Sequence, residues 1–194
     1  MNPLYEAALR IQVFCEAERW LFCIIGGIAV HRWGRLRATK DVDLTLLTGF
    51  DGEERFLDRL LTRYHLRAGY TREFVLQNRV LLLADEFDVA VDLSLGAIPF
   101  EERSIARSSS WRSPEGHELR TCSAEDLLVH KAFAAREHDW LDLEGILDRQ
   151  QSRLDLDLVR RELRPLAELK PETDILPELE RRILKAQRPI RRFN

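Results

Sequence analysis

The stretch from Ile24 to Leu47 constrains the fold of this chain more than any other segment. It begins with an apolar run that ends in Gly26-Gly27, and it closes with Asp41-Val42-Asp43 inside a second apolar run. Thirteen residues separate Gly27 from Asp41, which is enough for about two helical turns and a return to the sheet. Because side chains alternate between the two faces of a strand, Asp41 and Asp43 share one face. The stretch therefore predicts a glycine turn beside a pair of carboxylates.

The composition fits one domain with a sizeable core, or a domain with a helical appendix. Of the 194 residues, 45% are hydrophobic and 32% are charged. The formal net charge is -3, so nucleic acid would have to meet a local basic patch. Cys15, Cys23 and Cys122 lie in apolar surroundings without a CxxC spacing, which favours buried free thiols in a reducing compartment. No apolar run approaches the ~18 residues of a membrane span, so we expect a cytoplasmic protein without a membrane partner.

The hydrophobic pattern predicts strands mixed with helices, followed by helices alone. The predicted strands are residues 21–25, 41–47, 74–76, 80–83 and 87–93, and a hairpin that joins 108–111 to 117–122. The predicted helices are residues 3–19, 29–33, 53–64, 123–136 and 139–147, with further helices to about 187 that are broken at Pro165, Pro171 and Pro177. The change near residue 123 predicts a core domain, 1–122, and a C-terminal helical subdomain, 123–194.

A third carboxylate is expected near Asp41 and Asp43. Asp88 and Asp92 lie on the same face of the predicted strand 87–93, and either of them could join the pair. Carboxylates that converge at ~4 Å repel by ~4 kcal/mol at an effective dielectric near 20, so the cluster needs a cation or its pKa values rise. Ligands that offer only oxygen favour Mg²⁺ or Mn²⁺, with substrate phosphates completing the shell. The glycine turn would supply backbone N–H groups to those phosphates.

These residues carry a resemblance to a known superfamily. The pattern G-G-x13-D-V-D, with apolar residues around both aspartates, resembles the signature of the DNA polymerase beta-like nucleotidyltransferases. That signature includes a third carboxylate between apolar residues on a later strand. Val91-Asp92-Leu93 matches it, and Phe87-Asp88-Val89 is a weaker candidate.

The longer sequence pattern around these residues is similar to that of the AbiEii-type branch, which is known for toxins of toxin–antitoxin systems. Its matching segments are Gly26-Gly27-Ile28-Ala29 and Arg37-Ala38-Thr39-Lys40-Asp41-Val42-Asp43. That branch also has a C-terminal helical block with a lysine followed by an acidic cluster, and Lys131, Asp139 and Asp142 stand at the matching positions. The resemblance covers about residues 20–148.

The resemblance implies an α/β (α+β) fold of the nucleotidyltransferase type, in which helices flank a mixed twisted sheet and a helical subdomain follows. It also implies that an acceptor hydroxyl attacks the α-phosphate of a nucleoside triphosphate and releases pyrophosphate. Asp41 and Asp43 would bind two Mg²⁺ or Mn²⁺ ions, and Asp92 would bind one and take the acceptor's proton. The acceptor implied is tRNA or another macromolecule, and a cognate antitoxin is an implied partner.

Five residues are the candidates for nucleotide binding: Gly26, Gly27, Arg37, Thr39 and Lys131. Many members of the superfamily have Gly-Ser where this chain has Gly26-Gly27, so a serine contact to the phosphates is missing. Thr39 could substitute for that serine. Arg37, with its neighbours Arg35 and Lys40, could guide a nucleotide or an acceptor, or could belong to a solvated loop.

Several alternatives remain open. The acceptor could be a small molecule such as an aminoglycoside, and the chain could be a non-catalytic member that binds only a partner or a nucleotide. Lys131 could be a lysine whose stem packs on the core. Asp139 and Asp142 could hold Lys131 or Arg136, or could be carboxylates at the start of a helix. The basic stretch after Glu180 could contact RNA phosphate or complement the end of a helix.

Overall fold

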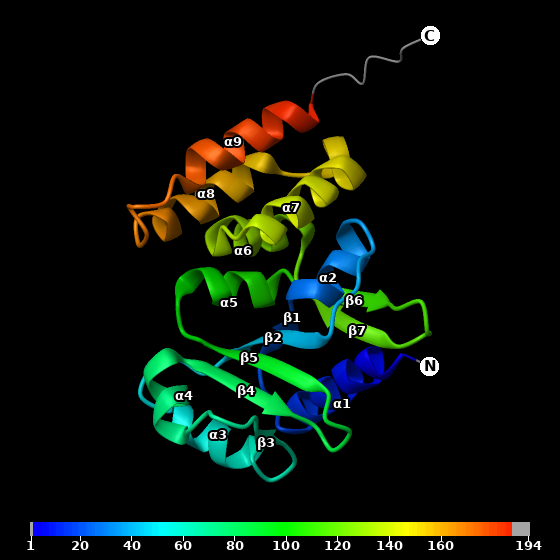
Figure 1. Cartoon of the computed structure of the whole chain (residues 1–194), viewed down its shortest axis with the longest axis vertical. Helices are drawn as coiled ribbons and strands as arrows, with labels where there is room; N and C mark the ends of the chain where they lie inside the picture. Colours follow the sequence, from blue (N-terminus) through cyan, green and yellow to red (C-terminus); the bar gives the residue numbers. More distant parts are fainter. Residues whose placement is uncertain (1, 188–194) are drawn as a thin grey trace. The chain divides into compact units, whose positions relative to one another are not determined.

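The computed structural model describes residues 2–187 (Figure 1). One compact unit comprises the residues up to Arg32 together with Arg37–Ser123. A second comprises Trp33–Leu36 together with the described residues from Ala124 onward. The domain limits predicted above, 1–122 and 123–194, stay a prediction, because compactness does not show that either part folds on its own.

The first unit is built on one mixed sheet, which confirms the predicted fold class. Within residues 2–187, the sheet has seven strands in the order β3-β4-β5-β2-β1-β7-β6. β2 is parallel to β5 and β1 is parallel to β7, and the other neighbours are antiparallel. The strands are β1 (Phe22–Ile24), β2 (Asp41–Leu47), β3 (His65–Leu66), β4 (Val80–Ala84), β5 (Ala90–Gly96), β6 (Ser109–Arg112) and β7 (Glu118–Thr121).

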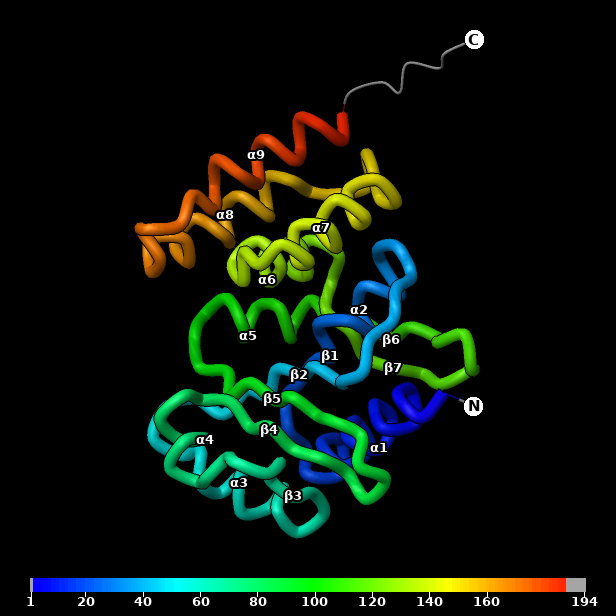
Figure 2. The backbone as a smooth tube through the Cα atoms, viewed as in Figure 1, coloured from blue at the N-terminus to red at the C-terminus, as the bar shows by residue number. Residues whose placement is uncertain are grey.

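Helices cover both faces of this sheet. Figures 1 and 2 show α2 and α5 on one face and α1 and α3 on the other. The helices of this part of the chain are α1 (Pro3–Ala17), α2 (Gly26–Trp33), α3 (Glu53–Leu60), α4 (Arg72–Asn78) and α5 (Pro99–Ala106). α1 begins where its sequence predicts, because the Asn2 side chain accepts the N–H of Leu4 at 3.1 Å and Pro3 takes the first turn.

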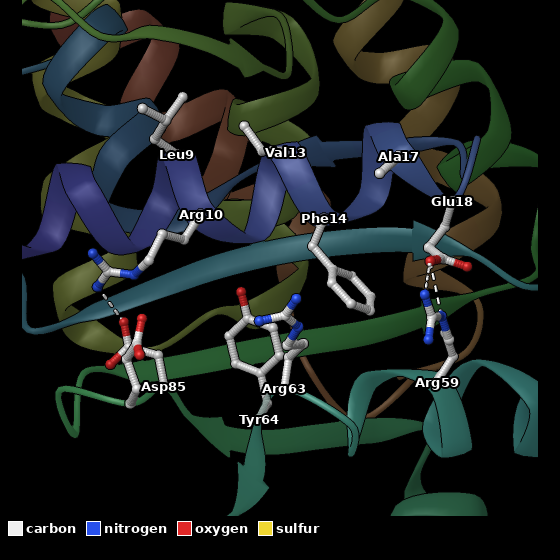
Figure 3. A pocket seen from close by; sticks show the side chains of 11 residues that line it. Leu9, Arg10, Val13, Phe14, Ala17, Glu18, Arg59, Arg63, Tyr64 and Asp85 are labelled. Atoms are coloured by element: carbon white, nitrogen blue, oxygen red, sulfur yellow. Dashed lines mark hydrogen bonds and ion pairs between the residues drawn. The ribbon is translucent and has the colours of Figure 1, made fainter.

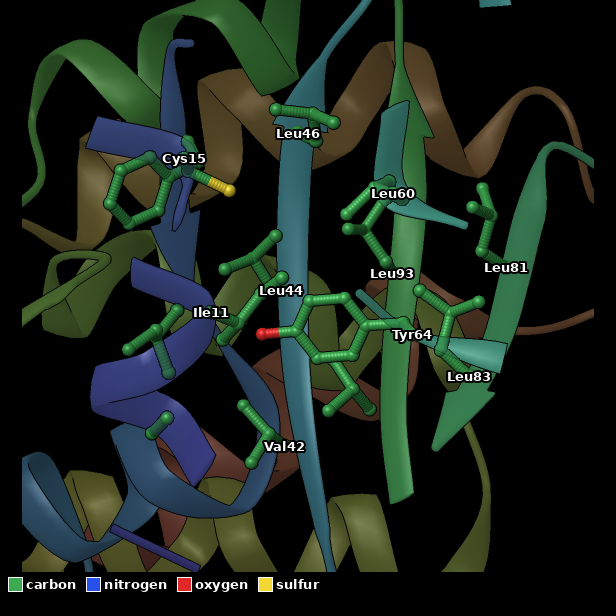
Figure 4. Packing of buried hydrophobic residues seen from close by; sticks show 14 of the residues in the cluster. Ile11, Cys15, Val42, Leu44, Leu46, Leu60, Tyr64, Leu81, Leu83 and Leu93 are labelled. Carbon is green, nitrogen blue, oxygen red and sulfur yellow. The ribbon is translucent and has the colours of Figure 1, made fainter. Parts of the chain in front are cut away.

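The hydrophobic core of the unit lies between the sheet and α1. Val42, Leu44 and Leu46 of β2 are fully buried, and they pack with Ile11 and Cys15 of α1 (Figure 4). Each such leucine stabilises the fold by about 1.5–3 kcal/mol. A slip of β2 by one residue would turn its two aspartates into this core, so the apolar alternation fixes the register of β2. The opposite face of β2 is thereby left to Asp41 and Asp43.

The three cysteines are free thiols in buried positions, as predicted. Burial raises the pKa of the Cys15 thiol to about 12, and Glu16 and Glu18 add to the shift. Cys15 is therefore an unreactive core residue.

The predicted strand 74–76 is wrong, and the predicted strand 87–93 is wrong in its first three residues. Residues 74–76 belong to helix α4, because Thr71 caps it by accepting the N–H of Phe74 at 3.2 Å. Residues 87–89 precede β5: the Asp85 carboxylate accepts the N–H of Phe87 and of Val89, and Asp88 lies in the left-handed region at φ 60°. In both places a local side-chain bond to the backbone overrides the propensity of apolar residues for strands.

Two elements have no counterpart in the sequence prediction. β3 is only two residues long. α5 begins at Pro99, and the Glu101 carboxylate accepts the N–H groups of Ala97 and Ile98 before its first turn. Such a pattern of proline and glutamate is a helix-start signal.

The second unit is helical after Ser123, as predicted. It comprises α6 (Ala124–Ala134), α7 (Glu137–Gln150), the 3-10 turn η1 (Gln151–Arg153), α8 (Leu156–Ala167) and α9 (Ile175–Ala186). The predicted breaks at Pro165 and Pro177 are wrong. Pro177 lies in the first turn of α9, where its missing N–H costs nothing, and Pro165 lies within the last turn of α8.

The basic stretch after Glu180 is held by acidic side chains as far as it is described. Arg181 and Arg182 pair with Glu178, and Lys185 pairs with Glu144. Residues 188–194, which contain the remaining arginines of that stretch, lie outside the described residues. Across residues 2–187, a helix both long and apolar enough to span a membrane is absent.

Candidate functional site

Three carboxylates converge on the sheet face opposite the core of α1. The register of β2 with β5 places Asp43 beside Asp92, and Asp41 follows two residues away on the same face. One oxygen of each of the three lies within 4.8 Å of the other two. Asp88 is exposed in the turn before β5 and is not part of this cluster. The cluster offers oxygen ligands alone, and this donor set fits Mg²⁺ or Mn²⁺.

The two glycines allow the start of α2 to approach this cluster. The N–H of Gly27 donates to Oδ2 of Asp43 at 3.3 Å. Gly26 has φ 57°, and a Cβ on it would lie 1.8 Å from the same oxygen. Only glycine meets both requirements, since L side chains disfavour that backbone region and would collide with Asp43. The pair Gly26-Gly27 thus brings the positive end of a helix to a carboxylate.

Thr39 fills the space beside Gly27. A Cβ on Gly27 would lie 2.2 Å from Oγ1 of Thr39, so a side chain at position 27 and Thr39 in its present place exclude each other. The Thr39 hydroxyl donates to Oδ1 of Asp41 at 3.0 Å. A hydroxyl therefore lies next to both Gly27 and the carboxylate cluster. It is the hydroxyl of Thr39, and not that of a serine at position 27.

The loop that carries Thr39 is braced by His31. Nδ1 of His31 lies 2.8 Å from the hydroxyl of Tyr5, and its Nε2 lies 2.7 Å from the carbonyl oxygen of Arg37. The imidazole accepts from Tyr5 and donates to that carbonyl, which ties the loop to α1 and α2. The exposed guanidinium of Arg37 donates to the carbonyl of Ala38 at 3.0 Å, and its part in nucleotide binding stays a prediction.

Arg67 is a member of the site that the sequence did not reveal. Its Nη2 donates to Oδ1 of Asp92 at 2.5 Å. Burial raises the pKa of Asp92 and the charge of Asp41 adds to this, while the Arg67 guanidinium opposes it. Arg67 follows a two-residue strand in a polar stretch, where neither periodicity nor a motif marks it.

Lys131 lies in the second unit, within a buried ionic cluster. Its Nζ lies 2.9 Å from Asp139 and 2.8 Å from Asp142, and Arg136 bonds the same Asp139. Burial alone would raise the pKa of Asp139, but its bonds to Arg136 and Lys131 hold that pKa below the usual value. Of the alternatives left open by the sequence, the structure has both aspartates holding Lys131, and Asp139 also holding Arg136. A role of Lys131 in nucleotide binding stays a prediction.

A cavity of about 490 Å³ lies on the other side of the sheet (Figure 3). Phe14 and other side chains of α1 line it, together with Arg63 and Tyr64. Ion pairs join Arg10 to Asp85 at one side and Glu18 to Arg59 at the other. The cavity contains no member of the carboxylate cluster.

The chain belongs to the family described as "Nucleotidyl transferase of unknown function (DUF2204)", whose model matches residues 11–183. No curated protein sequence matches it. The fold is that of nucleotidyltransferases.

Two solved structures have this fold. One is an antigenic nucleotidyltransferase-like protein from Paracoccidioides brasiliensis, with a TM-score of 0.50 and 14% identity, covering 90% of this chain and 91% of that chain. The other is the antibiotic-resistance factor ANT(2'')-Ia, with a TM-score of 0.51 and 16% identity, covering 89% of this chain and 96% of that chain. The structural similarity supports the fold, and at identities this low neither protein's substrate follows from it.

Replacement of Gly26 tests the close approach of α2 to Asp43. We expect Gly26→Ala to lower the free energy of unfolding by about 3 kcal/mol or more, because backbone strain and a collision with Asp43 add. Gly49→Ala is the matched control: Gly49 has φ 72° and open space around its Cβ position, so it should cost about 1 kcal/mol. Urea unfolding measures both, and equal costs would contradict the role assigned to Gly26.

Replacement of Lys131 tests how far the second unit depends on its ionic cluster. We expect Lys131→Met to lower the free energy of unfolding by about 3 kcal/mol, because it removes the ammonium between two buried carboxylates. Lys185→Met is the control, since Lys185 is exposed and pairs with Glu144 at the surface. Thermal unfolding followed by circular dichroism compares the two. If Lys131→Met is no less stable than the control, the cluster is not structural.

Proposed function

We propose that this protein transfers a nucleoside monophosphate from a nucleoside triphosphate to an acceptor hydroxyl. The observation that carries this proposal is the convergence of Asp41, Asp43 and Asp92 within 4.8 Å, beside the glycine start of a helix. Family membership supports the class of reaction. A non-catalytic protein has no reason to keep three carboxylates that repel one another.

Asp41 and Asp43 would hold two Mg²⁺ or Mn²⁺ ions, and Asp92 would hold one of them. Bound there, such ions would neutralise phosphate charge and lower the pKa of a coordinated hydroxyl. This role is supported by the β2–β5 register and by the Thr39 and Gly27 bonds to Asp41 and Asp43, which hold the three carboxylates together. The protein thus fixes the ligand oxygens before any ion arrives.

In the proposed reaction, the acceptor oxygen forms a bond to the α-phosphorus. The bond between that phosphorus and the oxygen bridging to the β-phosphate breaks, and pyrophosphate leaves with the electron pair. The proton of the acceptor hydroxyl passes to a carboxylate oxygen of Asp92. Atoms and charge then balance without any further reactant.

The nucleotide phosphates would bind at the start of α2. The N–H groups at Gly26-Gly27 and the dipole of the helix favour anions there. Thr39 would contribute the hydroxyl that serine supplies in many relatives of the superfamily, since it occupies the space beside Gly27. Arg37 would neutralise further phosphate charge.

Two classes of acceptor are candidates. The sequence of residues 26–43 favours the AbiEii-type branch, with tRNA or another macromolecule as acceptor and an antitoxin as partner. The second candidate is a small acceptor, such as an aminoglycoside, which the modest net charge of -3 allows. The reaction at phosphorus is the same in both cases.

The proposal predicts transfer of label from α-³²P nucleotides that depends on Mg²⁺ and on the carboxylate cluster. Each of the four nucleotides is incubated with total tRNA, with lysate protein and with aminoglycosides. We expect one acceptor class to be labelled by the wild type and to fall to background with Asp41→Asn/Asp43→Asn, because this variant lacks the shared ligands. Asp88→Asn, which alters an exposed carboxylate outside the cluster, should retain the activity.

Equal labelling by the double variant and the wild type would contradict the proposal. Thermal unfolding separates the non-catalytic alternative, since any ligand of the native state raises stability, by about 2.7 kcal/mol at a hundred times its Kd. A stabilised protein that transfers no label would favour a binding function. No stabilisation by any nucleotide with Mg²⁺ would argue against a nucleotide site.

A further inference from the structure

The sheet register places a cation in line with the carboxylate cluster. Leu82 of β4 lies opposite Asp92 of β5, and Asp92 lies opposite Asp43 of β2. The N–H of Arg67 donates to the carbonyl of Leu82 at 2.9 Å, which continues the row one strand further. Lateral neighbours in a sheet point to the same face. Arg67, Leu82, Asp92 and Asp43 therefore form one row on the face that carries the cluster.

The arginine side chain reaches across Leu82 to Asp92. Its Nη2 lies 2.5 Å from Oδ1 of Asp92, and its guanidinium lies 6.0 Å from the ring centre of Tyr70. The contact with Asp92 uses one nitrogen and one oxygen, not the paired fork that arginine and carboxylate often form. In the described part of the chain, Nε of Arg67 is buried and has no hydrogen-bond partner. The guanidinium is thus held by one oxygen of Asp92, and this carboxylate could also bind another cation.

Two demands on Asp92 are in conflict. A carboxylate has two oxygens, and Arg67 occupies one of them. A divalent ion bound by Asp41, Asp43 and Asp92 would draw on the same carboxylate and would be repelled by the guanidinium beside it. The arginine stabilises the cluster without a metal and opposes the metal when it binds.

We propose that Arg67 is a positioning residue that competes with the divalent ion for Asp92 and so weakens metal binding at the cluster. This inference rests on the proposed function, because it requires the cluster to bind a divalent ion. Arg67 holds the Asp92 carboxylate in place before the ion arrives and shares it afterwards. A purely structural arginine would have the opposite effect on removal, since a disordered Asp92 would bind the ion less well.

The test is the affinity of the protein for Mn²⁺, measured by isothermal titration calorimetry without nucleotide. We expect Arg67→Gln to bind Mn²⁺ about tenfold more tightly than the wild type, because a positive charge close to the ion is removed. Arg67→Lys keeps that charge and should stay close to the wild type. Arg67→Met keeps the length of the apolar stem over Leu82 and replaces Arg67→Gln if the glutamine variant does not fold.

Arg59→Gln is the matched control for net charge. Arg59 is also paired with a carboxylate, that of Glu18, but it lies on the other side of the sheet beside the cavity (Figure 3). Arg59→Gln removes the same charge as Arg67→Gln and should leave the affinity for Mn²⁺ unchanged. A gain in affinity shared by Arg59→Gln and Arg67→Gln would reflect the overall charge and would overturn the proposal.

Failure of the inference and failure of the proposed function give different results. If Asp41→Asn/Asp43→Asn binds Mn²⁺ as well as the wild type, the cluster is not a metal site and the proposed function fails. If binding requires the cluster but Arg67→Gln and Arg67→Met bind as tightly as the wild type or more weakly, only the competition by Arg67 is disproved. Tighter binding by the neutral variants, with Arg67→Lys and Arg59→Gln near the wild type, supports it.

Discussion

The repulsion among Asp41, Asp43 and Asp92 is the constraint on which the rest of the structure depends. Carboxylate oxygens within 4.8 Å of one another separate unless the backbone that carries them is fixed. β2 is fixed by its other face, where Val42, Leu44 and Leu46 are fully buried against α1. Packing energy from one face of the strand thus holds together charges on the other. Local bonds then complete the arrangement, from the N–H of Gly27, the hydroxyl of Thr39 and the guanidinium of Arg67.

The sequence predicted the parts of this arrangement that depend on periodicity. Alternation along residues 41–47 indicated both the strand and the shared face of its aspartates, and the structure has β2 at Asp41–Leu47. The glycine spacing indicated a short helix after a glycine turn, at residues 29–33. α2 ends at Trp33 as predicted but begins at Gly26, so the two glycines form its first turn. These features depend on one segment at a time, so a single sequence can reveal them.

Other features required pairings or bonds that leave no periodic signal. Alternation could not separate Asp88 from Asp92, because an Asp85 turn, and not hydrophobicity, decides where β5 begins. Arg67 lies near Asp92 because of the strand order β3-β4-β5. That order places the two-residue strand β3 beside β4, and β4 beside the strand that carries Asp92. Lys131 resembled a lysine for phosphate, and its buried bonds to Asp139 and Asp142 give it a structural role that spacing alone could not establish.

The proposed reaction and the role of Arg67 both depend on a divalent ion at the carboxylate cluster. The most direct measurement is anomalous diffraction at the manganese edge from crystals grown with MnCl₂ and a non-hydrolysable nucleoside triphosphate. We expect an anomalous peak within coordination distance of carboxylate oxygens of Asp41, Asp43 and Asp92. A map in which manganese is absent from these carboxylates, or binds elsewhere with the triphosphate, would contradict it.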